Sequence, residues 1–151
     1  SVFALSASTF ANPTSLTVIP GGTAIRTAVA DVNGDGTPDL IGGAGPGGTP
    51  TVVVIDGKTS AVIARFLAFE SSFTGGVYVT AGDLDGDGKA EVIVTPDRGG
   101  GPVVAVYSGV ALAAGTTTEL ARYLGIQDSN FRGGARAAIG DFTGDGVPDL
   151  V

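Results

Sequence analysis

The sequence DVNGDGTPDLI (residues 31–41) recurs as DLDGDGKAEVI (residues 83–93) and again as DFTGDGVPDLV (residues 141–151). The first Asp of each copy lies at position 31, 83 or 141, so successive copies are 52 and 58 residues apart. A period of this length is typical of solenoids, propellers and other arrays, whose units cannot bury their apolar faces alone. We therefore expect the chain to consist of repeated units that pack against one another.

Each unit contains four runs of residues that favour short strands. Val, Ile, Ala and Thr dominate these runs, and Gly and Pro between them favour tight turns over long helices. The first run precedes the acidic phrase, the second follows it, and a Gly-rich connector leads to the third and fourth. The first, third and fourth runs are 24–30, 51–57 and 61–69 in one unit and 77–81, 103–109 and 120–126 in the next, and the last unit has a first run at 135–139.

Four-stranded units of about 50 residues are the blades of β-propellers, so the sequence predicts an all-β propeller. A right-handed parallel solenoid is the alternative, although its coils are usually shorter than about 50 residues. The opening SVFALSA (1–7) is similar to the third run of the complete units, and the last acidic phrase supplies a first hairpin. We expect one repeat domain over residues 1–151, divided into a half-blade at 1–22, blades at 23–75 and 76–130, and a half-blade at 131–151.

Three blade equivalents do not close a ring, because propellers usually have about four to eight blades. Two chains supply six blade equivalents. We therefore expect a homodimer in which head-to-tail association completes a six-bladed ring and covers the sheet edges at both ends. The alternative is that the chain is a piece of a longer array.

Composition excludes several classes of partner. The net charge of −7 and the 8 scattered basic residues disfavour nucleic acid, whose binding depends on clustered Lys and Arg. No apolar run approaches the roughly 18 to 20 residues that a membrane-spanning helix requires. The chain has no Cys and no His, so neither a disulfide framework nor a zinc site is expected.

The acidic phrase has the composition of a metal-binding loop. It carries oxygen-bearing side chains at positions 1, 3, 5 and 9 of a nine-residue frame, with Gly at position 6. A tight loop can turn such side chains toward one point, and the position-7 carbonyl adds another oxygen; these hard ligands favour Ca²⁺ over Mg²⁺. The predicted ligands are Asp31, Asn33, Asp35, Thr37 and Asp39 in the first loop, Asp83, Asp85, Asp87, Lys89 and Glu91 in the second, and Asp141, Thr143, Asp145, Val147 and Asp149 in the third.

Two other interpretations of this loop explain the sequence less well. A helical EF-hand does not fit, because Gly42 and Val94 occupy position 12, where a Glu is expected. The dipeptides Asn-Gly and Asp-Gly are also good hairpin turns, which explains the Gly residues and one Asp in each copy. Turn chemistry leaves the acids at both ends of the frame unexplained, and carboxylates this close repel by about 1 kcal/mol or more per pair without a cation.

These residues resemble the FG-GAP, or VCBS-type, repeats of integrin alpha-chain-like β-propellers. The resemblance rests on the three D-x-[DNT]-G-D-G-x-x-[DE] loops, the connector GAGPGG (43–48) and the strand VVVIDGKT (52–59), and it covers essentially the whole chain. The chain matches the family's FG-GAP motif only loosely, as FTGG (73–76) and FRGG (131–134). The resemblance implies Ca²⁺ in the loop that joins two strands of a blade, held by side chains at positions 1, 3, 5 and 9 and the carbonyl at 7.

We expect a non-catalytic, calcium-binding scaffold or recognition module with a protein or glycan ligand. The resemblance implies a secreted or cell-surface location. No His is present, and no activated Ser or Lys setting is visible, so we do not expect an enzyme. A lectin-like propeller with a glycan site at each blade interface is the alternative, and a propeller enzyme is the third hypothesis. The aromatic residues recur at equivalent places, so we expect packing between blades from Phe66, Phe69, Phe73, Tyr78, Tyr107, Tyr123 and Phe131.

Overall fold

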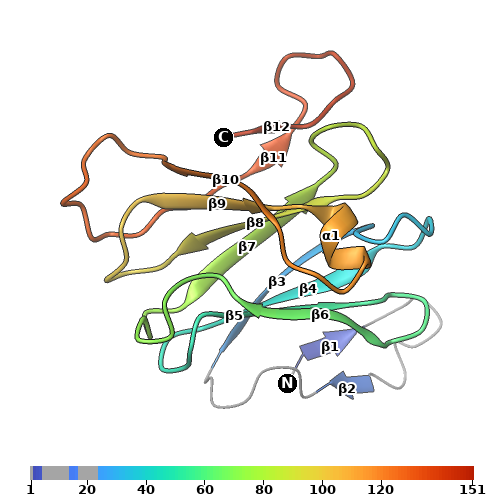
Figure 1. Ribbon diagram of the computed structural model, residues 1–151, viewed down its shortest axis with the longest axis horizontal. Helices are drawn as coiled ribbons and strands as arrows, with labels where there is room; N and C mark the ends of the chain where they lie inside the picture. The colour runs from blue at the N-terminus through green and yellow to red at the C-terminus, as the bar shows by residue number, and fades with distance from the viewer. Residues whose placement is uncertain (1, 5–13, 17–23) are drawn as a thin grey trace.

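A computed structural model of the protein describes residues 2–4, 14–16 and 24–151 (Figure 1). These residues form four antiparallel sheets and one short helix, which agrees with the all-β class expected from the repeat. The elements are β1 (Val2–Ala4), β2 (Thr14–Leu16), β3 (Ile25–Ala30), β4 (Asp39–Ala44), β5 (Thr51–Ile55), β6 (Val62–Leu67), β7 (Val77–Gly82), β8 (Glu91–Pro96), β9 (Val103–Tyr107), α1 (Gly109–Ala113), β10 (Glu119–Leu124), β11 (Ile139–Gly140) and β12 (Asp149–Leu150).

The two largest sheets have the same topology. Their strands follow one another in the order β3-β4-β5-β6 and β7-β8-β9-β10, and each strand is antiparallel to the next. We call them blade 1 and blade 2. Four-stranded meanders of this kind are the structure of propeller blades.

The remaining sheets have two strands each. Strands β1 and β2 pair from Val2↔Leu16 to Ala4↔Thr14, and β11 and β12 pair at Ile139↔Leu150 and Gly140↔Asp149. The β1–β2 sheet and the β11–β12 sheet lie at opposite ends of the stack, with blades 1 and 2 between them (Figure 1).

The main core lies between the two blades. The ring of Phe66 on β6 packs against the ring of Tyr107 on β9, with centroids 4.7 Å apart, and the Tyr107 hydroxyl donates a hydrogen bond to the Ala68 carbonyl at 2.9 Å. Near the inner strands the blades approach so closely that a Cβ at Gly43 would lie 2.9 Å from Cγ1 of Val79. Phe66 and Tyr107 therefore pack between blades, as expected from their repeat positions.

The inner strands are linked by a column of three side chains. Arg26, Tyr78 and Arg136 each lie five residues before the first Asp of an acidic loop. The guanidinium carbon of Arg26 lies 3.9 Å from the centroid of the Tyr78 ring, and that of Arg136 lies 4.3 Å from it. Such cation–π contacts are worth about 0.5 to 2 kcal/mol each, so this column joins three successive units.

Two local features differ from the sequence-based expectations. The connection between β9 and β10 forms α1, a single helical turn whose N-cap Ser108 accepts a bond from the Ala111 N–H at 3.2 Å. The strand expected at 135–139 is reduced to Ile139–Gly140. In blade 1 the equivalent residues 25–27 pair with 42–44, and the positions equivalent to 42–44 lie beyond residue 151.

Candidate metal centre

The three acidic loops join the first and second strands of their sheets and share one backbone conformation. The Gly residues at positions 4 and 6 all have φ between 76° and 87°, the left-handed region that favours glycine. The repeated Gly-Asp-Gly triplet is therefore required by the turn itself. These glycines are Gly34, Gly36, Gly86, Gly88, Gly144 and Gly146.

The Asp at position 1 organises each loop. In the first loop, Oδ1 of Asp31 accepts hydrogen bonds from the N–H groups of Gly34 (2.7 Å) and Asp35 (3.1 Å), and Oδ2 accepts one from Gly36 (2.7 Å). Asp83 and Asp141 accept the three equivalent bonds in the second and third loops. The position-1 carboxylate thus satisfies backbone donors that a tight loop cannot pair with strands.

The side chains at positions 3 and 5 also accept bonds within the loop. Oδ1 of Asn33 accepts from the Asp35 N–H at 2.9 Å, and the position-3 Asp85 accepts the equivalent bond at 3.2 Å. Oδ1 of the position-5 acid accepts from the position-7 N–H at 2.8 to 2.9 Å in every loop, and the acids are Asp35, Asp87 and Asp145. Each of these carboxylates keeps a second oxygen to which no backbone bond of the loop is made.

The acid at position 9 connects the loop to the rest of the blade. Asp39 is fully buried; its Oδ2 accepts from the N–H groups of Val32 (2.9 Å) and Asn33 (3.2 Å), and its Oδ1 accepts from Gly57 (3.0 Å) after β5. A Cβ at Gly57 would lie 2.0 Å from the Pro38 carbonyl oxygen, so only glycine fits there. The buried carboxylate therefore ties the acidic loop to the turn between β5 and β6.

The second blade repeats this arrangement with a longer acid. Glu91 is 2% exposed and accepts bonds from the N–H groups of Leu84 (2.9 Å) and, at the start of α1, Gly109 (3.4 Å). A Cβ at Gly109 would lie 2.5 Å from the Ala90 carbonyl oxygen. Sequence reasoning missed the role of Gly57 and Gly109, although each is the last residue of a third strand run, at 51–57 and 103–109.

The third loop keeps the bonds of its acids at positions 1, 5 and 9 in a more exposed setting. Oδ2 of Asp149 accepts from the N–H groups of Phe142 (2.8 Å) and Thr143 (3.0 Å). Asp149 is only partly buried, and among the described residues no third N–H reaches it. The acids at both ends of the frame thus have a turn-forming role in all three loops, which the sequence-based interpretation of the turn did not foresee.

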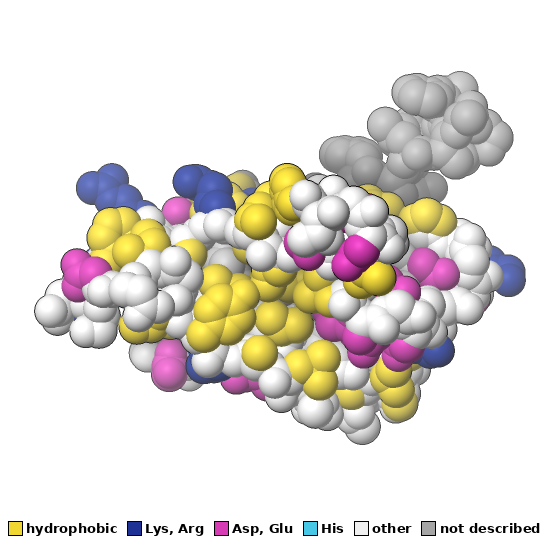
Figure 2. Space-filling model, turned by 90° about the horizontal axis from the view of Figure 1, so that it is seen from above, with side chains coloured by type: hydrophobic (Ala, Val, Ile, Leu, Met, Phe, Trp, Pro, Cys, Tyr) yellow, Lys and Arg dark blue, Asp and Glu magenta, His cyan; other side chains and the backbone are white. Residues whose placement is uncertain are grey.

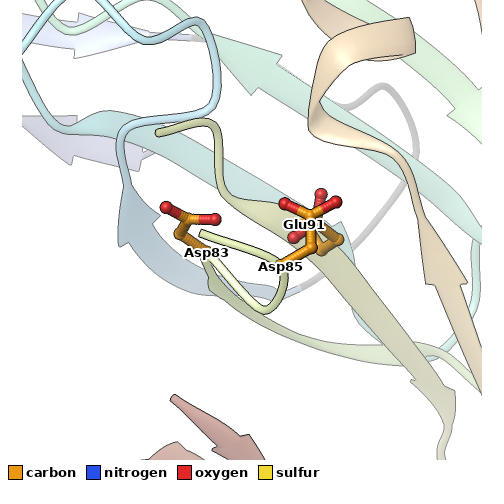
Figure 3. Close-up of side chains that lie close together, drawn as sticks. All are labelled: Asp83, Asp85 and Glu91. Atoms are coloured by element: carbon orange, nitrogen blue, oxygen red, sulfur yellow. The ribbon is translucent and has the colours of Figure 1, made fainter. Parts of the chain in front are cut away.

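The second loop brings three acids together (Figure 3). One carboxylate oxygen from each of Asp83, Asp85 and Glu91 lies within 4.8 Å of the others, a spacing at which one cation can bridge them. Burial raises the pKa of Glu91, and the charge of Asp85 adds to this effect, while the Leu84 and Gly109 N–H groups oppose it. Of the three fully described loops, this is the one in which three acidic side chains approach so closely.

The first two loops touch one another. The Ala90 N–H donates to the Asp31 carbonyl at 2.7 Å, and Cγ of Lys89 lies 3.1 Å from the place of a Cβ on Gly34. Lys58 approaches the free carboxylate oxygen of Asp35 at 3.8 Å. Two cationic side chains therefore lie beside the first loop and offset part of its negative charge.

Comparison with known families explains the repetition. The model of the FG-GAP-like repeat matches residues 31–94 and 83–151. The chain belongs to the FG-GAP-like repeat family. Both matches begin at the first Asp of an acidic loop, so each FG-GAP-like match runs from a loop of one sheet into the following sheet. No curated protein matches the chain.

The donor chemistry of the FG-GAP-like loops fits Ca²⁺. Every side chain assembled in the second loop is a carboxylate, and hard oxygen donors at flexible spacing suit this ion. The structure does not bring the position-5 Asp87 into the three-acid group, and the full set of predicted ligands stays a prediction. No helix among the described residues is long and apolar enough to cross a membrane.

Proposed function

We propose that the chain is a non-catalytic, calcium-binding, propeller-type module that serves as a rigid scaffold or recognition surface. The observation that carries this proposal is the group formed by Asp83, Asp85 and Glu91, whose oxygens lie within 4.8 Å of one another. Holding Glu91 charged against its burial and against Asp85 is unfavourable without a cation, and Ca²⁺ removes that cost. The equivalent loops in the other sheets make further, weaker sites.

A structural role for the ion follows from what the loop joins. Glu91 contacts the start of α1 through Gly109, and the second loop bonds to the first through Ala90 and Asp31. A cation at the second loop therefore stabilises both blades at one face of the stack. Millimolar Ca²⁺ outside the cell suits loops of this kind, so we propose a secreted or cell-surface location.

The test is calorimetric titration of the chelator-treated protein with Ca²⁺ and with Mg²⁺, combined with thermal unfolding. We expect Ca²⁺ to bind with preference over Mg²⁺ and to raise the melting temperature, since a ligand that binds only the folded state stabilises it. Asp85→Asn should weaken the tightest site, because it removes a ligand charge and leaves a similar shape. Asp128→Asn, which changes an exposed acid outside the loops, is the matched control.

The proposal fails if Ca²⁺ gives no binding heat and chelation leaves the melting temperature unchanged. It also fails in its assignment of the site if Asp85→Asn and Asp128→Asn have the same effect. Turnover of a substrate that depends on the acidic loops would overturn the non-catalytic part.

A glycan-binding role is the second candidate, and one cleft favours it. A cavity of about 360 Å³ lies at the junction of the blades, on the connections after β6, β8 and β10. Phe69 and Phe73 line it, with ring centroids 6.2 Å apart, together with Arg132 and the glycines at 99–101. Aromatic faces beside cationic groups suit sugars, and binding on a glycan array that is lost in Phe69→Ala but kept in Asp85→Asn would support this role.

A further inference from the structure

The outer strands of the two blades occupy equivalent places but have different surroundings. Phe66 on β6 pairs with Val52, and Tyr123 on β10 pairs with Val104, which is the same position of the repeat. Phe66 is 9% exposed because Tyr107, from the third strand of the next blade, covers it. Tyr123 is 45% exposed. By analogy with Phe66, Tyr123 would be covered by the third strand of a further blade.

The edge where that strand belongs is free among the described residues. Ala138 and Val151 exchange two backbone bonds, of 2.8 and 3.0 Å, so the alternation of an antiparallel ladder turns the N–H and C=O of Leu150 away from β11. In the complete blades the equivalent residues pair with the third strand, as Leu40 does with Ile55. The outward edge of β12 thus presents a donor and an acceptor in the register of a blade.

A groove lies beside this edge. It has a volume of about 290 Å³ and is lined by Tyr123, Ile126, Leu150 and Val151, among others. Ile126 and Val151 are 44% and 64% exposed. Apolar side chains gather in the middle of this end of the molecule, and acidic side chains lie around them toward both sides (Figure 2). An apolar groove beside an open strand edge is the arrangement that accepts an added strand.

The chain carries a strand pair of the matching type at its other end. Residues 2–4 occupy the same place in the repeat as 52–54 and 104–106, the cores of the third strands. Strand β1 pairs with β2 in antiparallel fashion, as β5 pairs with β6. The β1–β2 sheet lies at the end of the stack opposite β12, so it does not fill the groove of its own chain (Figure 1).

We propose that the β12 edge and the Tyr123 groove bind the β1–β2 sheet of a second copy of this chain, and that two such contacts close a ring. The inner pair β11–β12 and the outer pair β1–β2 together make one four-stranded blade. Each copy then gives and receives a strand pair, which leaves no open edge at either end. This inference rests on the exposed groove and the strand register, and it does not depend on calcium.

The test is the mass of the full chain in solution, measured by light scattering over a dilution series. We expect twice the mass of the 14.8 kDa chain. Tyr123→Asp should weaken the dimer by at least about thirtyfold, because it places a charge where an aromatic ring is to be covered. Tyr123→Phe should keep the dimer. Val110→Asp is the matched control, since Val110 is 50% exposed on α1, outside the groove.

Hydrogen exchange gives a readout of the edge itself. The Leu150 amide should become protected as the protein concentration rises, in step with the dimer mass, and should lose that protection in Tyr123→Asp. A chain that stays monomeric at every concentration overturns the proposal. So does a dimer that Tyr123→Asp leaves intact, or a ladder of larger assemblies in place of a closed pair.

Discussion

The first and third acidic loops share the hydrogen bonds made by their acids at positions 1, 5 and 9, but their surroundings differ. In both, the position-1 acid accepts three loop N–H groups and the position-9 acid accepts two. Asp39 also receives the Gly57 N–H and is fully buried, whereas Asp149 is partly exposed. The shape of the loop is thus a local property, while burial of its last acid requires the turn after the third strand.

Gly57→Ala should have the largest effect on stability, because it disrupts the contact between Gly57 and Asp39, which has no counterpart in the third loop. The added Cβ would lie 2.0 Å from the Pro38 carbonyl oxygen, and backbone has to move to admit it. We expect a loss of about 3 kcal/mol or more in the free energy of unfolding, measured with urea. Gly101→Ala is the control, since its nearest neighbour would be 3.7 Å away. A cost similar to that of the control would show that the turn is free to shift.

Asp39→Ala and Asp149→Ala test the comparison directly. Removal of Asp39 leaves three backbone donors, from Val32, Asn33 and Gly57, without their acceptor in a buried place, which should cost about 3 kcal/mol. Asp149→Ala should cost about 1 kcal/mol or less, because water can reach the donors it releases. Equal losses in urea unfolding would mean that burial of the position-9 acid contributes nothing.

Calcium binding should distinguish the loops by their acids. The second loop has acids at positions 1, 3, 5 and 9, whereas position 3 is Asn33 in the first loop and Thr143 in the third. Thr143→Asp should raise the affinity of the third loop by about tenfold, since a charged oxygen ligand replaces a hydroxyl. Calorimetric titration measures this change, with Thr143→Asn as the uncharged control. An unchanged affinity would show that the acid at position 3 does not contribute to calcium binding.

The smallest effect should come from Asp56, in the turn that covers the first loop. Hydrogen bonds from the N–H groups of Thr59 and Lys58, both 2.8 Å, hold the pKa of Asp56 below its ordinary value of 3.8. A depressed pKa contributes stability above the ordinary pKa, and this is lost as the pH falls through the folded value. Asp56→Asn should therefore lower the melting temperature slightly at pH 7 and leave it unchanged in strong acid, and an NMR titration of the carboxyl group should give a midpoint below 3.8.

Much of the fold was predictable from the repeat, because strand-forming runs and acidic turns recur at a regular spacing. The third and fourth runs at 51–57 and 61–69 correspond to β5 and β6. Helix α1 was missed because Gly109–Ala113 forms only one turn, too short for a helical period to appear. The strand expected at 135–139 is limited to Ile139–Gly140, because the residues that would pair with 135–137 lie beyond residue 151.

The site was predictable in its residue types and less so in its geometry. Spacing placed acids at positions 1, 3, 5 and 9, but it did not show that backbone N–H groups occupy many of the same carboxylate oxygens. The bonds from Gly57 and Gly109 arise from contacts between distant segments, which no local pattern encodes. Nor did the spacing distinguish the second loop, whose longer Glu91 reaches the group formed with Asp83 and Asp85.

The column formed by Arg26, Tyr78 and Arg136 has a practical consequence. The protein contains three Tyr residues and no Trp, so its near-ultraviolet signal comes chiefly from tyrosine. Tyr78 lies between the inner strands, Tyr107 lies in the core between the blades, and Tyr123 lies in the open groove. Burial raises the pKa of Tyr107 to about 12, which sets its ionisation late in an alkaline titration. The three tyrosines thus report on three different surroundings, and single Tyr→Phe variants assign the signals without any added dye.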